Sequence, residues 1–151
     1  MIMAKKIHKF KGFTILEEGV KIELDLDRIE NNFNAAQFAL DSAVMTSMVP
    51  LMPMDTGHFI NVTKEMSAAM AGSGKVVAAA PPQGRFLYEG KVMVGVNSRS
   101  AWAKKAEKKV ATKFNLQYSR PGAKPHWFDE AKKKDGDNWV DLVKKTAGGG
   151  K

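Results

Sequence analysis

The chain has 151 residues, of which 44% are hydrophobic and 26% charged, and this length and composition suit one folded domain with one core. It contains no cysteine, which excludes disulfide scaffolds, thiolate metal sites and cysteine nucleophiles. No apolar run approaches the ~18 residues that a membrane-spanning helix needs, and no apolar stretch follows the first lysines as a secretory signal requires. We therefore expect a protein that is made in the cytoplasm, has no membrane partner and leaves the cell only within a larger particle.

The positive charge is concentrated in the last third of the chain. Residues 101–151 carry 13 basic and 6 acidic side chains, a net charge of +7, whereas residues 1–100 have a net charge of +1. Such a segment can bind nucleic acid or an acidic protein surface, or it can be a solvated lysine-rich face. Arg120 is its single arginine, and since base readers favour arginine we expect no sequence-specific DNA binding. The candidate contacts to DNA or to an acidic partner are Lys104, Lys105, Lys108, Lys109, Lys132, Lys133 and Lys134.

The first third of the chain predicts extended structure followed by a long helix. Residues 7–18 favour a strand or a hairpin, and apolar and polar side chains alternate over 20–26, which predicts a strand with one buried face. Asp27 is the predicted N-cap of the helix, with Glu30 as its capping-box partner. An apolar stripe follows at spacings of three and four residues, and Pro50 ends the helix. The members of the stripe are Ile29, Phe33, Ala36, Leu40, Val44 and Met48.

The middle of the chain predicts short elements separated by turns. Residues 58–63 are rich in β-formers and predict a strand that leaves a loop at 49–57. The remaining predicted elements are a turn at 68–74, a short apolar strand at 75–80, one helical turn at 83–90 and a strand at 91–96.

The end of the chain predicts an irregular segment and then helices. Within residues 97–124, positions 98–113 are rich in alanine and lysine and have helical propensity but little apolar periodicity. We therefore expect a mobile segment or one that becomes ordered on a partner. Pro125 suits the first turn of a helix. Gly136 is expected to divide this region into two helices, with Asp135 or Asp137 as the cap of the second.

These elements together predict a single α+β domain over residues 1–147, with a flexible tail at 148–151. In this fold the long helix packs on a mostly antiparallel sheet, and further helices follow at the carboxyl end. The large apolar side chains predict core or interface positions rather than a base-stacking platform. These residues are Phe33, Leu40, Tyr88, Trp127, Phe128 and Trp139.

The polar residues do not predict catalysis, a metal site or a cofactor site. The three histidines, at positions 8, 58 and 126, do not have metal-ligand spacing. The glycines around Lys75 lack the spacing of a phosphate-binding loop and predict a flexible turn.

The loop at residues 53–57 contains Asp-Thr-Gly, a sequence that also occurs in aspartic proteases. In those enzymes the aspartate works with a second carboxylate, which a homodimer can supply. The residues around this motif differ from those of the proteases, because Pro53 and a methionine precede Asp55 and two large side chains follow Gly57. We therefore favour a structural turn in which Asp55 or Thr56 accepts a backbone N–H and Gly57 has a positive φ.

Four segments occur in a fixed order within residues 26–145: a long capped helix, the turn segment Pro53-Met54-Asp55-Thr56-Gly57-His58-Phe59, an aromatic segment and a final basic helix. The aromatic segment is Arg85-Phe86-Leu87-Tyr88-Glu89-Gly90-Lys91-Val92, and the final helix starts with Pro125-His126-Trp127-Phe128-Asp129-Glu130-Ala131-Lys132. This ordered set resembles the minor capsid, or tail-completion, proteins of long-tailed bacteriophages and prophages of Gram-positive bacteria. The chain differs from that pattern in lacking a doubled tyrosine before Gly90 and in having a longer segment at 97–124.

The resemblance implies a virion protein with no enzymatic activity and no cofactor, which forms a ring in the phage neck between the DNA-filled head and the tail. Such rings are usually hexamers or dodecamers. The implied partners are further copies of the chain, the neighbouring connector, head-closure and tail proteins, and packaged DNA through non-specific contacts. Tail completion, head closure and tail termination are all open as the position in the neck. The alternatives are a small basic nucleic-acid-binding protein and, less favoured, a homodimeric aspartic protease that uses Asp55.

Overall fold

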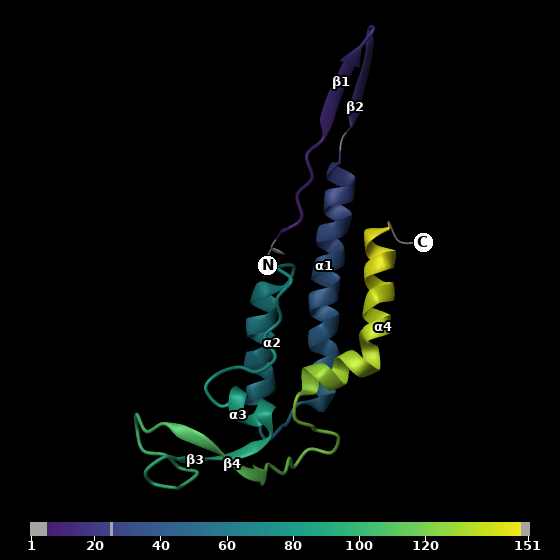
Figure 1. The fold of residues 1–151 in the computed structure, drawn as a ribbon. Coiled ribbons are helices and arrows are strands. Elements are labelled where there is room, and N and C mark those ends of the chain that lie inside the picture. The colour runs from purple at the N-terminus through teal and green to yellow at the C-terminus, as the bar shows by residue number, and fades with distance from the viewer. Residues whose placement is uncertain (1–5, 25, 149–151) are drawn as a thin grey trace.

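The computed structural model describes residues 6–24 and 26–148. Figure 1 shows helices α1, α2 and α4 side by side, with one hairpin projecting beyond the amino end of α1 and a second hairpin at the opposite end of the molecule. None of the helices in the described ranges is long and apolar enough to cross a membrane. The elements are β1 (Phe13–Glu17), β2 (Val20–Leu24), α1 (Asp27–Met48), the 3-10 helix η1 (Val49–Leu51), α2 (His58–Met70), α3 (Gly84–Glu89), β3 (Lys91–Gly95), β4 (Lys109–Asn115) and α4 (Trp127–Ala147).

The core lies between α1, α2 and α4, near the carboxyl end of α1. Met48, Trp127 and Ala131 have no exposed surface. Full burial of a large apolar side chain stabilises a fold by roughly 1.5–3 kcal/mol, so this cluster is the main source of stability. The whole cluster is Val44, Met45, Met48, Met52, Ile60, Trp127, Ala131 and Trp139. The predicted α+β class is confirmed, but the sheet consists of two separate antiparallel hairpins, and α1 packs mainly against α4.

Helix α1 confirms the predicted apolar stripe from Ala36 onwards, whereas Ile29 and Phe33 in its first turns are 43% and 40% exposed. The start of the helix also differs from the prediction. Leu26 precedes the helix as its N-cap residue, so Asp27 is the first helical residue rather than the cap. Glu30, the predicted capping-box partner, accepts a hydrogen bond of 3.1 Å from the backbone N–H of Phe10. Both carboxylates lie in the first turn, where the helix dipole favours negative charge. The helix ends before Pro50, as predicted.

The hairpin of β1 and β2 confirms the predicted extended structure but corrects the burial of one of its faces. Glu18 and Gly19 at the turn both have positive φ, 48° and 80°, as a two-residue type I′ turn requires. The alternating apolar residues do share one face, yet Val20 and Ile22 are 60% and 55% exposed. The predicted burial is therefore wrong for the single chain. Alternation specifies which side chains lie together, but it does not specify what covers them.

Residues 58–63 begin helix α2, so the predicted strand is wrong. Ile60, Thr63 and Ser67 are the buried residues of this helix, and their spacing of three and four is helical. Because two of these three side chains are polar, the sequence shows no apolar helical periodicity here. The nearby β-forming residues therefore led to the wrong prediction. Tertiary packing of this face outweighs the local β-propensity.

The segment at 75–80 is not a strand, because side chains rather than a neighbouring strand satisfy its backbone. The hydroxyl of Ser67 accepts a hydrogen bond from the N–H of Val77 and donates one to its carbonyl oxygen, both at 3.0 Å. The hydroxyl of Thr63 accepts a hydrogen bond of 3.2 Å from the N–H of Ala80. The segment is thus attached to α2. The turn predicted at 68–74 is confirmed only over 71–74, because residues 68–70 belong to α2.

The predicted helical turn at 83–90 and the strand at 91–96 are confirmed as α3 and β3. Residues 97–124, however, contain strand β4, which pairs antiparallel with β3. The signal for this strand was the run of Val110, Ala111 and Thr112 between Lys109 and Lys113, in which the β-formers Val110 and Thr112 recur at a spacing of two. Arg120 anchors the rest of the segment, since its guanidinium donates hydrogen bonds of 2.9 and 3.3 Å to carbonyl oxygens of Val49 and Met52.

Helix α4 is continuous from Trp127 to Ala147, so the predicted division at Gly136 into two helices is wrong. Figure 1 shows instead a bend within a single helix. The helix starts two residues after Pro125, and His126 is its N-cap residue with a φ of 50°. Gly148 is the C-cap residue, and the remainder of the predicted flexible tail, 149–151, lies outside the described residues.

Candidate assembly site

Trp127 lies at the centre of an aromatic cluster that joins three segments of the chain. Its indole Nε1 donates a hydrogen bond of 2.8 Å to the carbonyl oxygen of Ala78, so its polar atom is paired. The rings of Tyr88 and Phe59 meet the indole edge to face, with centroids 4.8 Å and 6.0 Å away. Burial, together with the nearby charge of Asp129, raises the pKa of the Tyr88 phenol. The cluster therefore holds an uncharged tyrosine against a buried tryptophan.

The aromatic segment with Tyr88 is bonded directly to the start of α4. The backbone N–H of His126 donates a hydrogen bond of 2.9 Å to the carbonyl oxygen of Tyr88, and their rings lie 5.1 Å apart. The imidazole Nε2 of His126 lies 3.6 Å from the carboxylate of Glu89. Gly90 has a φ of 68°, and a Cβ at this position would lie 2.6 Å from the Cβ of Pro125. Only glycine fits there, so two motifs that lie apart in the sequence form one contact.

The loop at 53–57 lies beside this cluster and leads into it. Gly57 has a φ of 85°, as predicted, and the hydroxyl of Thr56 accepts a hydrogen bond of 3.4 Å from the N–H of His58. The loop is thus a turn that starts α2. A cavity of about 310 Å³ lies between the loop and α3, and all the residues that line it belong to the described part of the chain. Asp55 is exposed and is the only carboxylate among these lining residues. Within one chain, Asp55 has no second carboxylate beside it in this cavity.

The other predicted core or interface residues divide between the core and the projecting hairpin. Phe128 stacks on Trp139 with a centroid distance of 6.3 Å, and Leu40 packs half-buried against the same core. Phe33 is 40% exposed and lies near the amino end of α1, where the ring of Phe10 meets it at 5.4 Å. The structure therefore brings most of these residues to one core and leaves Phe33 at the base of the projecting hairpin.

The seven predicted contact lysines fall on two parts of the fold. Lys104, Lys105, Lys108 and Lys109 lie in the β3–β4 loop or at the start of β4, and the other three lie on α4. Most are exposed, whereas the Nζ of Lys109 donates a hydrogen bond of 2.7 Å to the carbonyl oxygen of a neighbouring loop residue. The positive charge predicted from the sequence is thus spread over two surfaces rather than gathered in one.

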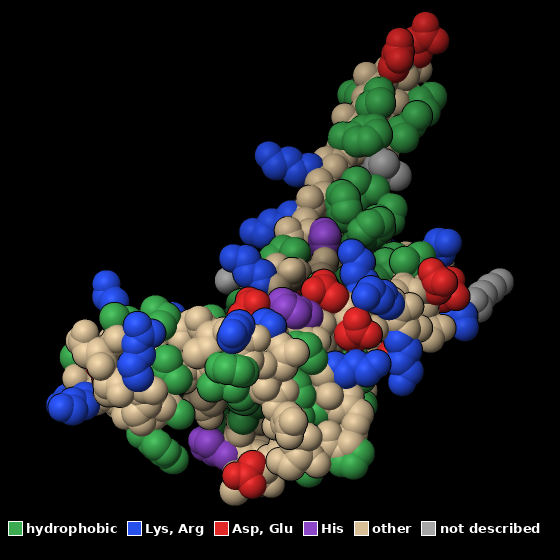
Figure 2. Space-filling model, turned by 60° about the horizontal axis from the view of Figure 1, so that its bottom comes forward, with side chains coloured by type: hydrophobic (Ala, Val, Ile, Leu, Met, Phe, Trp, Pro, Cys, Tyr) green, Lys and Arg blue, Asp and Glu red, His purple; other side chains and the backbone are tan. Residues whose placement is uncertain are grey.

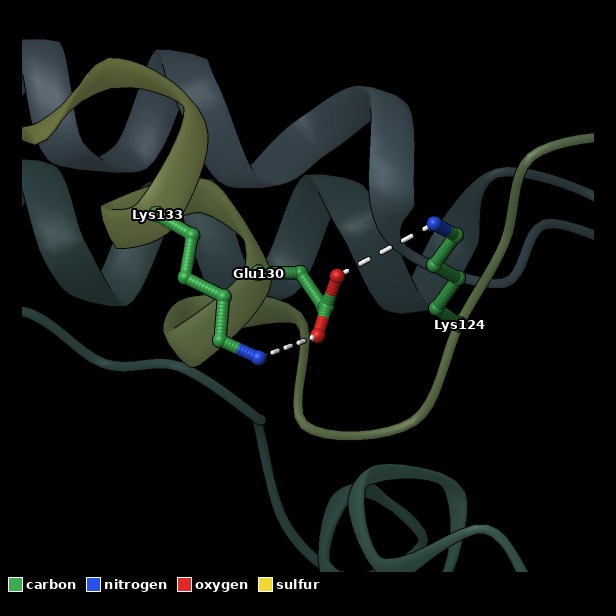
Figure 3. A network of polar contacts seen from close by, with 3 residues as sticks. All are labelled: Lys124, Glu130 and Lys133. Atoms are coloured by element: carbon green, nitrogen blue, oxygen red, sulfur yellow. Dashed lines mark hydrogen bonds and ion pairs between the residues drawn. The ribbon is translucent and has the colours of Figure 1, made fainter.

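One of the α4 lysines takes part in a small ionic network with Glu130, which Figure 3 shows. The Nζ of Lys133 donates a hydrogen bond of 3.0 Å to one carboxylate oxygen of Glu130, and Lys124 lies 3.9 Å from the other oxygen. The hydrogen bond and charge of Lys133, with the charge of Lys124, lower the pKa of Glu130. Lys132 and Lys134, the other two predicted contact lysines on α4, are both exposed, and neither forms an ion pair with a described residue.

Glu107 organises the β3–β4 loop, a role that the sequence pattern did not indicate. Its carboxylate accepts hydrogen bonds from the backbone N–H groups of Ser98 at 2.7 Å, Lys104 at 2.9 Å and Asn97 at 2.8 Å. These bonds lower the pKa of Glu107 to about 2. Trp102, also in this loop, is 90% exposed. The loop therefore combines an ordered backbone with an exposed aromatic side chain and exposed lysines.

In the ranges that the structure describes, no group of three or more histidine, cysteine, aspartate or glutamate side chains is placed to hold a metal ion. Comparison of the chain with protein-family models, with curated proteins and with solved structures finds no match. The aromatic cluster, the two hairpins and the lysines are therefore interpreted from their own contacts.

Proposed function

We propose that the protein is a structural subunit that forms a ring in the neck of a long-tailed bacteriophage, where the DNA-filled head joins the tail. The observation that carries this proposal is the convergence around Trp127 of Phe59, at the end of the 53–59 turn segment, of the aromatic segment through Tyr88, and of the start of α4. These are three of the four segments on which the resemblance rests. Their mutual packing gives a physical reason for their joint occurrence, because each one completes the environment of the others.

The chemistry of this junction favours a structural role over a catalytic one. It brings together rings, a glycine that fits against Pro125, and paired backbone groups, and its titratable pair, His126 and Glu89, is exposed to solvent. A catalytic site would bring titratable side chains together in a cavity with matched pKa values. The proposal accordingly includes no chemical step.

The shape of the subunit supports ring formation. A closed ring needs two different surfaces on each subunit, one for each neighbour. The two hairpins extend from opposite ends of the helical body, as Figure 1 shows, and both carry exposed large hydrophobic side chains. The exposed lysines of α4 and of the β3–β4 loop suit non-specific contacts with packaged DNA or with acidic neck proteins.

A second candidate function is a small basic nucleic-acid-binding protein, and the exposed Trp102 favours it. Single-stranded nucleic acid binds to surfaces that combine lysines with an aromatic ring on which a base can stack. Lys104 and Lys105 are exposed in the same loop. This function requires salt-dependent affinity of the monomer or dimer for DNA, whereas the neck function requires a larger assembly.

The test is to locate the protein in purified virions from cells that encode it. Mass spectrometry of the virions and immunogold electron microscopy are expected to detect the protein at the head–tail junction. Its absence from purified virions would overturn the proposal. Absence from virions together with salt-dependent DNA binding by a monomer or dimer would support the second candidate.

A further inference from the structure

The hairpin of β1 and β2, here called the arm, carries an apolar face that the chain itself does not cover. Ile15 pairs with Ile22, and Phe13 and Val20 lie on the same side of the hairpin. These four side chains, here called the arm face, are 45–60% exposed. Figure 2 shows hydrophobic side chains along the arm and acidic side chains at its tip. An exposed apolar surface of this kind marks an interaction site.

The base of the arm is fixed on α1, so the arm is held ready for docking. The buried side chain of Asn34 accepts hydrogen bonds of 3.1 and 3.0 Å from the N–H groups of Ile7 and His8. Its amide donates a bond of 2.8 Å back to the carbonyl oxygen of His8. These contacts attach the chain before β1 to the helix after β2. An arm fixed in this way loses little conformational entropy when it binds.

An apolar groove of about 400 Å³ runs along α4 where it meets α1. Leu40, Trp139, Val140 and Val143 line it, and Val140 is 51% exposed. Lys132 and Lys144 also border the groove, and both are exposed. The groove thus offers an apolar floor with positive charge beside it.

The charges of the arm and of the groove are complementary. The arm ends in Glu17 and Glu18, which are exposed at the turn. An arm face placed on the apolar floor would bring these carboxylates within reach of Lys132 and Lys144 beside the groove. Opposite charges at the edge of an apolar contact steer association and fix its direction. A second arm would instead present the same acidic tip, so the groove is the better partner for the arm face.

We infer that the arm of one copy docks in the α4 groove of a second copy. In Figure 1 the arm of the chain points away from its own body, beyond the amino end of α1, while α4 lies beside that helix. Each copy therefore donates an arm on one side and offers a groove on another. This head-to-tail contact builds a ring when it closes. The inference deepens the proposed ring function by assigning its subunit contact.

Cysteine cross-linking tests the contact directly, because the chain contains no cysteine of its own. Full-length Ile22→Cys and Val143→Cys chains, distinguished by tags, are mixed and oxidised. We expect the disulfide between the two variants to exceed either self-linked product at least tenfold. Leu16→Cys is the matched control, since Leu16 lies on the opposite face of the same arm and is 74% exposed. Equal cross-linking from Leu16→Cys, or a dominant Ile22→Cys self-product, would overturn the inference.

Charge reversal tests the same contact without a disulfide. We expect Glu17→Lys with Glu18→Lys to weaken self-association at least tenfold in sedimentation experiments, and Lys132→Glu with Lys144→Glu to do the same. A chain with all four changes restores the charge pairs between copies, so its association is expected to recover to within threefold of the wild-type value. A folding defect would not be repaired in this way. Failure of the fourfold variant to recover would contradict the contact.

The outcomes separate this inference from the proposed function. If the protein occurs at the neck of virions but none of the arm and groove substitutions changes its self-association, the arm contact fails and the neck function stands. If arm and groove cross-link as expected but the protein is absent from virions, the contact stands and the neck function fails. The contact is overturned if the wild-type chain stays monomeric at all concentrations and the Ile22→Cys and Val143→Cys chains form no disulfide with each other.

Discussion

The indole of Trp127 donates a hydrogen bond of 2.8 Å to the carbonyl oxygen of Ala78, which lies 49 residues earlier in the chain. This bond fixes the first turn of α4 to the irregular segment that the hydroxyls of Thr63 and Ser67 hold from the other side. The same indole receives the rings of Tyr88 and Phe59. One side chain thus joins α2, α3 and α4, and its contacts lead to the first prediction.

Replacing Trp127 with phenylalanine should destabilise the protein by about 1–3 kcal/mol, because the carbonyl oxygen of Ala78 loses its donor and the smaller ring leaves a cavity. Trp102→Phe is the matched control, since Trp102 is 90% exposed and its change should cost less than about 0.5 kcal/mol. Urea unfolding followed by circular dichroism measures both values. Equal effects of the two changes would contradict a central role for Trp127.

Gly90→Ala should destabilise the protein by about 2–4 kcal/mol. Alanine at a φ of 68° is strained, and its Cβ would lie 2.6 Å from the Cβ of Pro125. Gly19→Ala separates the two causes, because Gly19 has a φ of 80° but no atom within 4 Å of the point that an alanine Cβ would occupy, so only about 1–2 kcal/mol is expected. Thermal unfolding of the two variants checks the difference. A loss at Gly90 no larger than that at Gly19 would show that the close approach to Pro125 is easily relieved.

Replacement by alanine should destabilise the protein much more at Asp41 than at Asp55. Asp41 is buried, and its carboxylate accepts hydrogen bonds of 2.8 and 3.0 Å from the N–H groups of Gly72 and Gly74. Asp41→Ala leaves these donors unpaired and should cost about 1–3 kcal/mol. Asp55 is exposed, and the hydroxyl of Thr56, not the Asp55 carboxylate, accepts the backbone hydrogen bond of the 53–57 turn. Asp55→Ala should therefore cost less than about 0.5 kcal/mol.

Denaturant unfolding measures the free energy of both aspartate variants. A large loss of unfolding free energy in Asp55→Ala would instead support the prediction that the Asp55 carboxylate accepts a backbone N–H in the turn. An Asp55→Asn chain that keeps its stability but loses a pepstatin-sensitive cleavage would instead support the protease alternative.

The carboxylate of Glu107 should give the β3–β4 loop a pH dependence at low pH. Its folded pKa of about 2 lies below the ordinary glutamate value of 4.5, so the ionised form favours the folded loop. The stabilisation is therefore complete above about pH 4.5 and is lost as the pH falls through about 2. Carboxyl NMR titration of Glu107 should show this pKa, and the loop amides of Ser98 and Lys104 should exchange faster over the same range.

Glu107→Gln should remove that titration and speed the exchange of the same amides already at neutral pH. Glu65→Gln, which removes an exposed charge on α2, is the control for the change in net charge. Unchanged loop exchange in Glu107→Gln would mean that the three backbone hydrogen bonds do not hold the loop.

Local patterns predicted several parts of this fold well. The apolar stripe predicted α1, since helical periodicity is a property of contiguous sequence. The positive φ of Gly57 followed from the turn, because glycine is the residue that adopts this conformation without strain. The sequence motifs identified the segments that lie around Trp127. Which of these segments are in contact could not be derived from their spacing along the chain.

Other parts were decided only in three dimensions. The start of α2 carries β-forming residues, yet it is helical. The helix places the hydroxyls of Ser67 and Thr63 against the backbone of Val77 and Ala80, which lie 10 and 17 residues further along the chain. Glu107 likewise accepts hydrogen bonds from the backbone N–H groups of Asn97 and Ser98, which are 10 and 9 residues earlier in the chain and which the β3–β4 pairing brings within reach. Polar side chains with distant partners leave no periodic signal, so sequence patterns predicted these regions wrongly or left them undefined.

The sequence by itself determined the α+β class, the long helix, the turn at Gly57 and the concentration of lysines in the last third of the chain. Each of these depends on neighbouring residues or on composition alone. The tertiary structure decided that three motifs meet at Trp127 and that the alternating face of the arm lies uncovered. The physical reason is that burial depends on what the rest of the chain places against a surface. In this protein the chain covers Trp127 completely and leaves the arm face exposed.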